Sequence, residues 1–151
     1  MPTVRYAIGG SRRDNEYFNR SGGDVGPVTT VREIRKRGDA DAKPVTMLTA
    51  YDATTAAVLE EVGIDVILVG DSVGDTALGY ESTLPVTYEE IKSRSAAVAR
   101  ATDDALVVAD MPFLSVGVDE SESLRNCGQL LKDAGVDAVK IESGGHTVEL
   151  T

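Results

Sequence analysis

Three carboxylates, Asp71, Asp110 and Glu142, each stand at or beside the carboxyl end of a short apolar run. If those runs are neighbouring parallel strands, the three side chains lie on one rim, where α/β proteins place their ligands. Carboxylates gathered in this way repel one another unless a cation lies among them, and Mg²⁺ prefers oxygen ligands. We therefore predict a Mg²⁺ site at these residues. Any one of them alone could instead cap the helix that follows its strand.

Lys140 and Ser72 add groups that could hold an anion at the same rim. Lys140 stands two residues before Glu142, so in a strand both side chains point to the same face. A lysine within an apolar strand is costly unless an anion pairs with it, and that anion is either the acidic cluster or a substrate carboxylate. Ser72 offers a hydroxyl and neighbouring N–H groups to the same anion. His146, the single histidine, is more typical of a solvated loop residue than of a ligand.

The elements that must position these groups alternate between strands and helices. Apolar runs with the length of buried strands occupy residues 45–50, 66–69, 105–109 and 138–141. Segments with helical apolar spacing occupy residues 53–62, 88–101 and 120–134, and residues 30–38 resemble a short helix with a threonine cap. This alternation predicts βαβ units with right-handed crossovers, and therefore a parallel sheet in sequential strand order, with each crossover helix on the same side.

The charge of the chain excludes some partners. The 151 residues have a formal net charge of −10, and residues 44–151 hold nineteen acidic against six basic side chains. Such a surface repels phosphate backbones, so we expect no nucleic-acid partner. This acidic composition with few lysines indicates a protein of a halophile's cytosol. The alternative is an ordinary acidic protein. No run is long and apolar enough for a membrane span, and Cys127 stands alone, so we expect a cytoplasmic protein without membrane contact.

Five short sequence motifs resemble those of the ketopantoate hydroxymethyltransferases (3-methyl-2-oxobutanoate hydroxymethyltransferases) of pantothenate biosynthesis. They are MLTAYD at 47–52, LVGDSVG at 68–74, STLPVT at 82–87, ADMPF at 109–113 and VKIE at 139–142. The resemblance implies an α/β fold of the (β/α)8 TIM-barrel type and a homo-oligomer for full-length members. It also implies transfer of a one-carbon unit from methylenetetrahydrofolate, or from a related methylenetetrahydropterin, to 3-methyl-2-oxobutanoate, giving 2-dehydropantoate.

The resemblance also assigns roles to individual residues. Asp71, Asp110 and Glu142 match the family's Mg²⁺ ligands or their supports, whereas Asp71, Ser72, Asp110 and Lys140 match its contacts to the 2-oxo acid. The chemistry agrees, because a 2-oxo acid can chelate Mg²⁺, which then stabilises the enolate formed when C3 loses a proton. Lys140 would neutralise the substrate carboxylate.

The chain also departs from the family pattern. A (β/α)8 barrel typically has about 250 residues, so we expect residues 29–151 to form its N-terminal half, with about four strands and an unpaired apolar edge at the last one. Residues 1–28 have no sustained apolar period and are expected to be a tail without regular structure, or a product of a start codon placed too far upstream.

No general base is identified in this sequence. The family's base, a glutamate on a later strand, lies beyond residue 151, and Asp52, Glu142 or an acid of the 79–81 loop are poor substitutes. We therefore expect little or no activity from the chain alone. The alternatives are a non-catalytic half-barrel, one part of a split enzyme, or a Mg²⁺/2-oxo-acid barrel enzyme of the phosphoenolpyruvate mutase and isocitrate lyase type. The STLPVT motif at 82–87 argues against the last of these.

Overall fold

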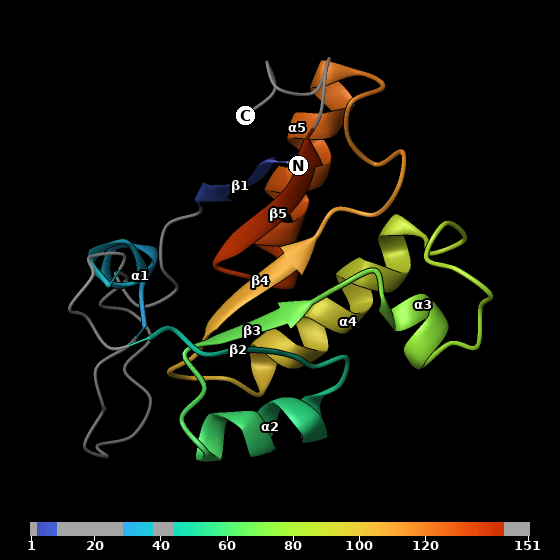
Figure 1. Ribbon diagram of the computed structural model, residues 1–151. Coiled ribbons are helices and arrows are strands. Elements are labelled where there is room, and N and C mark those ends of the chain that lie inside the picture. Colours follow the sequence, from blue (N-terminus) through green and yellow to red (C-terminus); the bar gives the residue numbers. More distant parts are fainter. Residues whose placement is uncertain (1–2, 9–28, 38–43, 144–151) are drawn as a thin grey trace.

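One mixed sheet runs through the residues that the computed structural model describes, which are 3–8, 29–37 and 44–143 (Figure 1). Its strands are β1 (Thr3–Ile8), β2 (Met47–Thr49), β3 (Val66–Val69), β4 (Leu106–Asp110) and β5 (Ala138–Ser143). Strands β2, β3, β4 and β5 are parallel neighbours in sequential order, which confirms the predicted topology. This is the order in which successive βα units build a (β/α)8 barrel.

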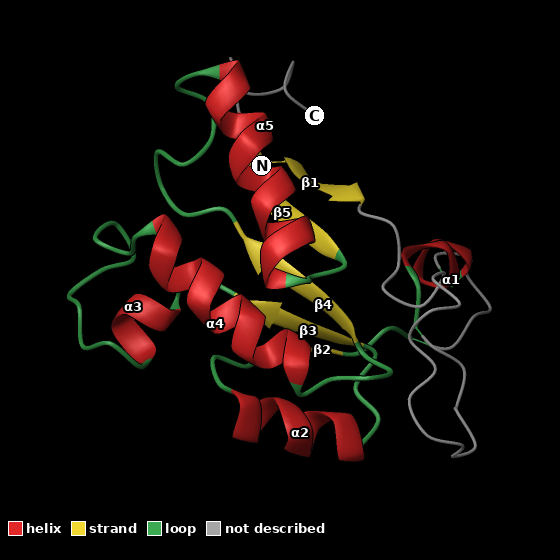
Figure 2. Cartoon of the chain, turned by 180° about the vertical axis from the view of Figure 1, so that it is seen from behind, coloured by secondary structure: helices red, strands yellow, loops and turns green. Residues whose placement is uncertain are grey.

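The helices that follow these strands lie on one face of the sheet (Figure 2). They are α2 (Ala53–Glu61), α4 (Tyr88–Arg100) and α5 (Glu120–Gln129), and α5 continues into the π-helical segment η1 (Leu130–Ala134). The short helix α3 (Val73–Thr76) lies between β3 and α4 and was not predicted. No helix in the described ranges is long and apolar enough to cross a membrane.

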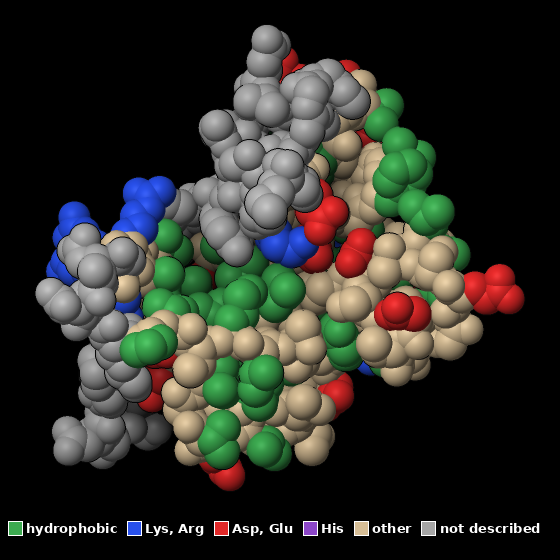
Figure 3. All heavy atoms as spheres, viewed as in Figure 1, with side chains coloured by type: hydrophobic (Ala, Val, Ile, Leu, Met, Phe, Trp, Pro, Cys, Tyr) green, Lys and Arg blue, Asp and Glu red, His purple; other side chains and the backbone are tan. Residues whose placement is uncertain are grey.

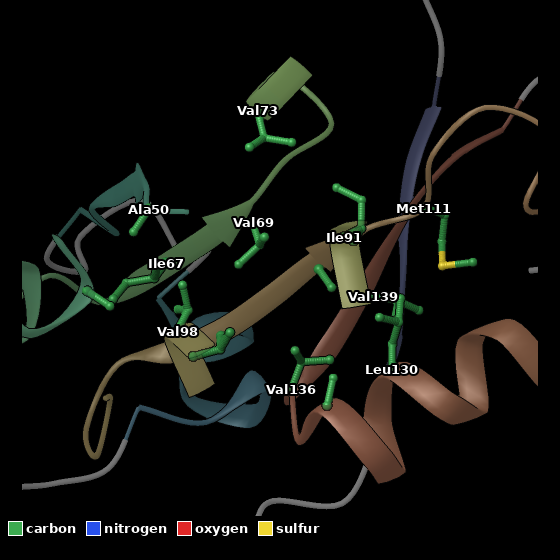
Figure 4. Packing of buried hydrophobic residues seen from close by; sticks show 14 of the residues in the cluster. Ala50, Ile67, Val69, Val73, Ile91, Val98, Met111, Leu130, Val136 and Val139 are labelled. Carbon is green, nitrogen blue, oxygen red and sulfur yellow. The ribbon is translucent and has the colours of Figure 1, made fainter. Parts of the chain in front are cut away.

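The main core fills the space between the sheet and these helices (Figure 4). Alternate residues of the strands supply one side of it, and α4 and η1 supply the other. Its fully buried members include Ile67, Val69, Val107, Val139, Ile91, Val98 and Leu130. Each such side chain contributes about 1.5–3 kcal/mol through burial, so this layer fixes the sheet on which the candidate site residues stand.

The opposite face of the sheet carries a smaller apolar cluster near the amino ends of the strands. Val66, Leu106, Val108 and Ala138 form it, and helix α1 (Val31–Lys36) packs against it. The side chain of Thr30 caps α1, as the sequence predicted, and Glu33 completes a capping box with it. This face is therefore apolar toward its amino end, whereas Asp110 and Lys140 stand on it at the carboxyl end.

Strand β1 lies within the segment that we expected to have no regular structure. It pairs antiparallel with β5, from Thr3 opposite Ser143 to Ile8 opposite Ala138. The expectation of an unpaired edge at the fourth parallel strand is therefore wrong, and that of an unstructured tail fails for these six residues. The missed signal is the period-two alternation of Val4, Tyr6 and Ile8, which suits a strand, and an open strand edge favours such pairing.

Asp65 ties α1 to the amino end of the sheet. It is 6% exposed, accepts hydrogen bonds from the N–H and hydroxyl of Thr46 at 2.9 and 3.0 Å, and forms an ion pair with Arg37. Burial raises the pKa of Asp65, but the bonds from Thr46 and Arg37 outweigh it and hold that pKa below its usual value.

Replacing Asp65 by asparagine is expected to lower the free energy of unfolding by about 2 kcal/mol at pH 7, because bonds to a charged acceptor are lost. A carboxyl with a lowered folded-state pKa stabilises the fold above its unfolded pKa, and loses that contribution as pH falls through the folded pKa. The difference in the free energy of unfolding between the two proteins, measured with urea, should therefore disappear below pH 4. A difference independent of pH would contradict an ionic role for Asp65.

Gly74 lies where α3 closely approaches the segment before α4. A Cβ at Gly74 would be 2.6 Å from Val86 Cγ2 and 3.2 Å from the Ser82 carbonyl oxygen. We expect Gly74→Ala to lower the free energy of unfolding by about 1–3 kcal/mol through overpacking. Gly128→Ala is the matched control, because a Cβ there meets nothing within 4 Å and should stabilise α5 by about 0.5–1 kcal/mol. Equal effects of the two changes in urea unfolding would contradict this account.

Candidate active site

Asp110, Lys140 and Glu142 come together at the carboxyl ends of β4 and β5. Asp110 is the ladder partner of Lys140, so the two side chains share a face of the sheet. Lys140 Nζ lies 2.8 Å from Asp110 Oδ2 and 3.0 Å from Glu142 Oε1. The Asp110 and Lys140 side chains are 5% and 12% exposed, and that of Glu142 is 69% exposed. Figure 3 shows acidic side chains gathered around a basic one on this face.

The charges of this cluster are not fully balanced. Burial raises the pKa of the Asp110 carboxyl, the Lys140 ammonium opposes that rise, and the charges of Asp71 and Glu142 add to it. Burial lowers the pKa of Lys140, but its bonds to Asp110 and Glu142 outweigh this and hold it above its usual value, so the amine is protonated. The second oxygen, Asp110 Oδ1, is buried without a hydrogen-bond partner among the described residues. A buried carboxylate oxygen in that state favours a cation or donor beside it.

Ser72 and Asp110 border the space beside Gly70. A Cβ at Gly70 would lie 3.0 Å from Ser72 Oγ and 3.8 Å from Asp110 Oδ2, so any larger residue there would crowd the Ser72 hydroxyl. The Tyr51 hydroxyl lies 2.9 Å from Ser72 Oγ, and Arg94 donates to the Tyr51 carbonyl at 3.2 Å. Sequence reasoning missed Tyr51 as a site residue, although it belongs to the MLTAYD word.

The side chains present suit a Mg²⁺ site with fewer direct carboxylate ligands than the three that the sequence predicted. Among the side chains that the structure describes, no three of the types Asp, Glu, His and Cys are placed to hold a metal ion, and Glu142 is bonded to Lys140. Mg²⁺ commonly uses only one or two carboxylates, and takes its other oxygens from water and substrate. Asp110 supplies an unpartnered oxygen, and Asp71 adds negative charge close enough to act on it. Asp110 and Asp71 are therefore the side chains best suited to bind Mg²⁺, and Glu142 would support the site by its bond to Lys140.

The other acids considered as a base have different roles or surroundings. Asp52 caps α2 by accepting bonds from the N–H and hydroxyl of Thr55 at 2.8 and 3.0 Å, and these bonds lower its pKa. A carboxyl with a lowered pKa is a weak base, which agrees with the low expectation placed on it. Glu81 is exposed. His146 lies outside the described residues.

Strands β2 to β5 are parallel and in sequential order, the helices that follow them lie on one face, and polar groups stand at their carboxyl ends. This arrangement places the chain in the (β/α)-barrel class of α/β proteins. The family described as ketopantoate hydroxymethyltransferase matches residues 28–151. A 3-methyl-2-oxobutanoate hydroxymethyltransferase from Natronomonas pharaonis is 66% identical over 76% of this chain and 43% of its own length. Another, from Halobacterium salinarum, is 62% identical over 82% of this chain and 46% of its own length. The chain belongs to the ketopantoate hydroxymethyltransferase family and spans under half the length of these haloarchaeal relatives.

A solved structure shows the same fold at low identity. The phosphoenolpyruvate phosphomutase from Streptomyces platensis subsp. rosaceus aligns with a TM-score of 0.56 at 21% identity, covering 73% of this chain and 37% of that protein. A 2,3-dimethylmalate lyase, described as a member of the PEP mutase/isocitrate lyase superfamily, aligns with a TM-score of 0.52 at 19% identity, covering 74% of this chain and 39% of that protein. These likenesses show the fold alone. The predicted (β/α)8 fold class is thereby confirmed.

Proposed function

We propose that this chain carries the Mg²⁺- and 2-oxo-acid-binding half of a 3-methyl-2-oxobutanoate hydroxymethyltransferase. The reaction would transfer a one-carbon unit from methylenetetrahydrofolate or a related methylenetetrahydropterin and form 2-dehydropantoate, in the cytoplasmic synthesis of pantothenate. The observation that carries the proposal is the buried Asp110–Lys140 pair with its unpartnered carboxylate oxygen, at the carboxyl ends of the sheet in a chain of this family.

Lys140 and Ser72 would bind the substrate carboxylate. Lys140 is protonated, and one of its two partners, Glu142, is mostly exposed to water, so that bond can be exchanged for one to substrate at low cost. The bond to Asp110 would remain and keep the ammonium in place. The Tyr51 hydroxyl lies 2.9 Å from Ser72 Oγ and would hold the Ser72 hydroxyl in place beside Gly70.

Asp110 and Asp71 would hold Mg²⁺, which would act as a Lewis acid on the keto oxygen and so make the C3 proton more acidic. A base must then remove that proton, and Asp52 and Glu142 are poorly suited to it, because Asp52 caps a helix and Glu142 is bonded to Lys140. We propose that the base comes from the part of the family's length that this chain does not match.

Isothermal titration of the purified chain with 3-methyl-2-oxobutanoate tests this function. We expect binding with Mg²⁺ present and at least tenfold weaker binding in EDTA, because the keto acid needs the metal as its second anchor. The control ligand is 3-methylbutanoate, which lacks the keto oxygen and should bind weakly under both conditions. Equal affinity for the keto acid with and without Mg²⁺ would contradict the proposal.

A further inference from the structure

A groove of about 400 Å³ lies between the segments that follow β3 and β4. Its volume is within the range of small-molecule sites, and both segments are on the side of the sheet where (β/α) folds bind ligands. Its lining is part aromatic and aliphatic and part polar, and it includes Tyr88, Phe113, Leu114, Ser115, Glu122 and Asn126. Hydrophobic side chains gather on the surface over the β4–α5 segment in Figure 3.

The β4–α5 wall of this groove is held in a strained conformation. Leu114 has a φ of 64°, a left-handed value that bulky residues rarely adopt. Short bonds fix the segment around it: the Ser115 N–H and hydroxyl donate to the Pro112 carbonyl at 3.0 and 2.7 Å, and Asn126 Nδ2 donates to the Ser115 carbonyl at 2.8 Å. The result is that Phe113 and Leu114 remain 61% and 65% exposed beside the groove. Strain maintained by its surroundings in this way is typical of ligand-binding segments.

The groove matches a flat heterocycle with paired hydrogen-bond donors. Phe113 and Tyr88 offer aromatic surfaces, and the Tyr88 hydroxyl donates to the Asn126 carbonyl at 2.9 Å, which joins the two walls. Glu122 adds a carboxylate whose oxygens accept no hydrogen bond from the described residues. The 2-amino and N3–H groups of a reduced pterin lie on one edge of its ring and can both donate to one carboxylate.

The groove also lies close to the candidate active site. Phe113 is three residues after Asp110, so their Cα atoms are at most about 11 Å apart. A ring bound at Phe113 would therefore be next to a 2-oxo acid bound at Asp110, as a one-carbon donor must be. We propose that this groove binds the pterin ring of the one-carbon donor, an inference that rests on the proposed function.

Binding of two reduced pterins by the full chain tests the inference. The probes are 5-formyltetrahydrofolate, which carries an aminobenzoyl-glutamate tail, and 6-methyltetrahydropterin, which has none. We expect both to bind, and Phe113→Ala and Glu122→Gln each to weaken both by about tenfold. Leu124→Ala and Glu120→Gln are the matched controls, because they make similar changes at exposed positions outside the lining and should leave affinity unchanged.

Each other outcome overturns the groove assignment. Tail-dependent binding, shown by the folate alone, would contradict recognition through the ring, as would pterin affinity unaffected by Phe113→Ala and Glu122→Gln. Self-association that Phe113→Ala abolishes, without pterin binding, would show that the groove is an interface between copies. Titration of the same samples with 3-methyl-2-oxobutanoate and Mg²⁺ separates the two proposals: keto-acid binding that survives while pterin binding fails overturns the groove alone.

Discussion

Replacing Lys140 by methionine is expected to weaken the binding of 3-methyl-2-oxobutanoate about 100-fold. The ammonium would be the group that neutralises the substrate carboxylate in a buried setting, where loss of one partner of a charge pair costs about 2–5 kcal/mol. The same change leaves Asp110 buried without its cation, since Lys140 Nζ lies 2.8 Å from its carboxylate. Asp110 is then expected to take up a proton, because its pKa is already raised by burial, and a neutral acid holds Mg²⁺ poorly.

Lys92→Met is the matched control for this experiment. Lys92 pairs with Asp133 at 3.2 Å on the helical side of the sheet, so the variant makes the same change of charge away from the site. Its affinity for the keto acid should equal that of the wild type. If Lys140→Met also keeps wild-type affinity, Lys140 serves only to neutralise the acidic cluster and does not contact substrate.

The chain alone is expected to show no hydroxymethyl transfer above the rate without enzyme. General-base catalysis typically contributes about 10²–10⁴ in rate, and the positioning of two substrates contributes further. Addition of the part of the Natronomonas pharaonis relative that this chain does not match should restore some transfer, because the chain spans 43% of that protein and the added part would supply the base that we propose lies there.

Two controls make the activity experiment decisive. The Asp110→Asn variant with the same added part should remain inactive, because the carboxylate that we propose as a Mg²⁺ ligand is lost. Robust turnover by the chain alone would contradict the account and would point to a base that we set aside. Asp52→Asn and Glu81→Gln would then identify which acid removes the proton.

Much of the framework was predictable because its signals are local. The helical apolar spacing of residues 88–101 predicted a helix there, and α4 spans Tyr88–Arg100. The run of four apolar residues in β3 was predicted at its observed bounds. By contrast, β1 pairs with β5 across 130 to 140 positions of the chain, and its short local alternation does not specify that partner.

The site was predictable in its residues and less so in its contacts. The spacing of Lys140 and Glu142 placed both on one face, and the ladder adds Asp110 beside them. The choice between a metal and Lys140 as the partner of Glu142 depends on side-chain geometry, and the observed bond is to Lys140. Tyr51 could not be assigned to Ser72 from the sequence, because their contact arises only when β2 and β3 are packed side by side.

Paramagnetic broadening by Mn²⁺ in an amide NMR spectrum of the ¹⁵N-labelled chain tests the central claim most directly, since Mn²⁺ accepts the same oxygen ligands as Mg²⁺. With molar KCl to screen the acidic surface, we predict selective broadening at the carboxyl ends of the strands, around Asp71, Asp110 and Glu142, which Mg²⁺ reverses and Asp110→Asn abolishes. Signals around the buried Asp65, at the opposite end of the sheet, should remain sharp. Broadening spread over the surface carboxylates, or unchanged in Asp110→Asn, would contradict a metal site at this rim.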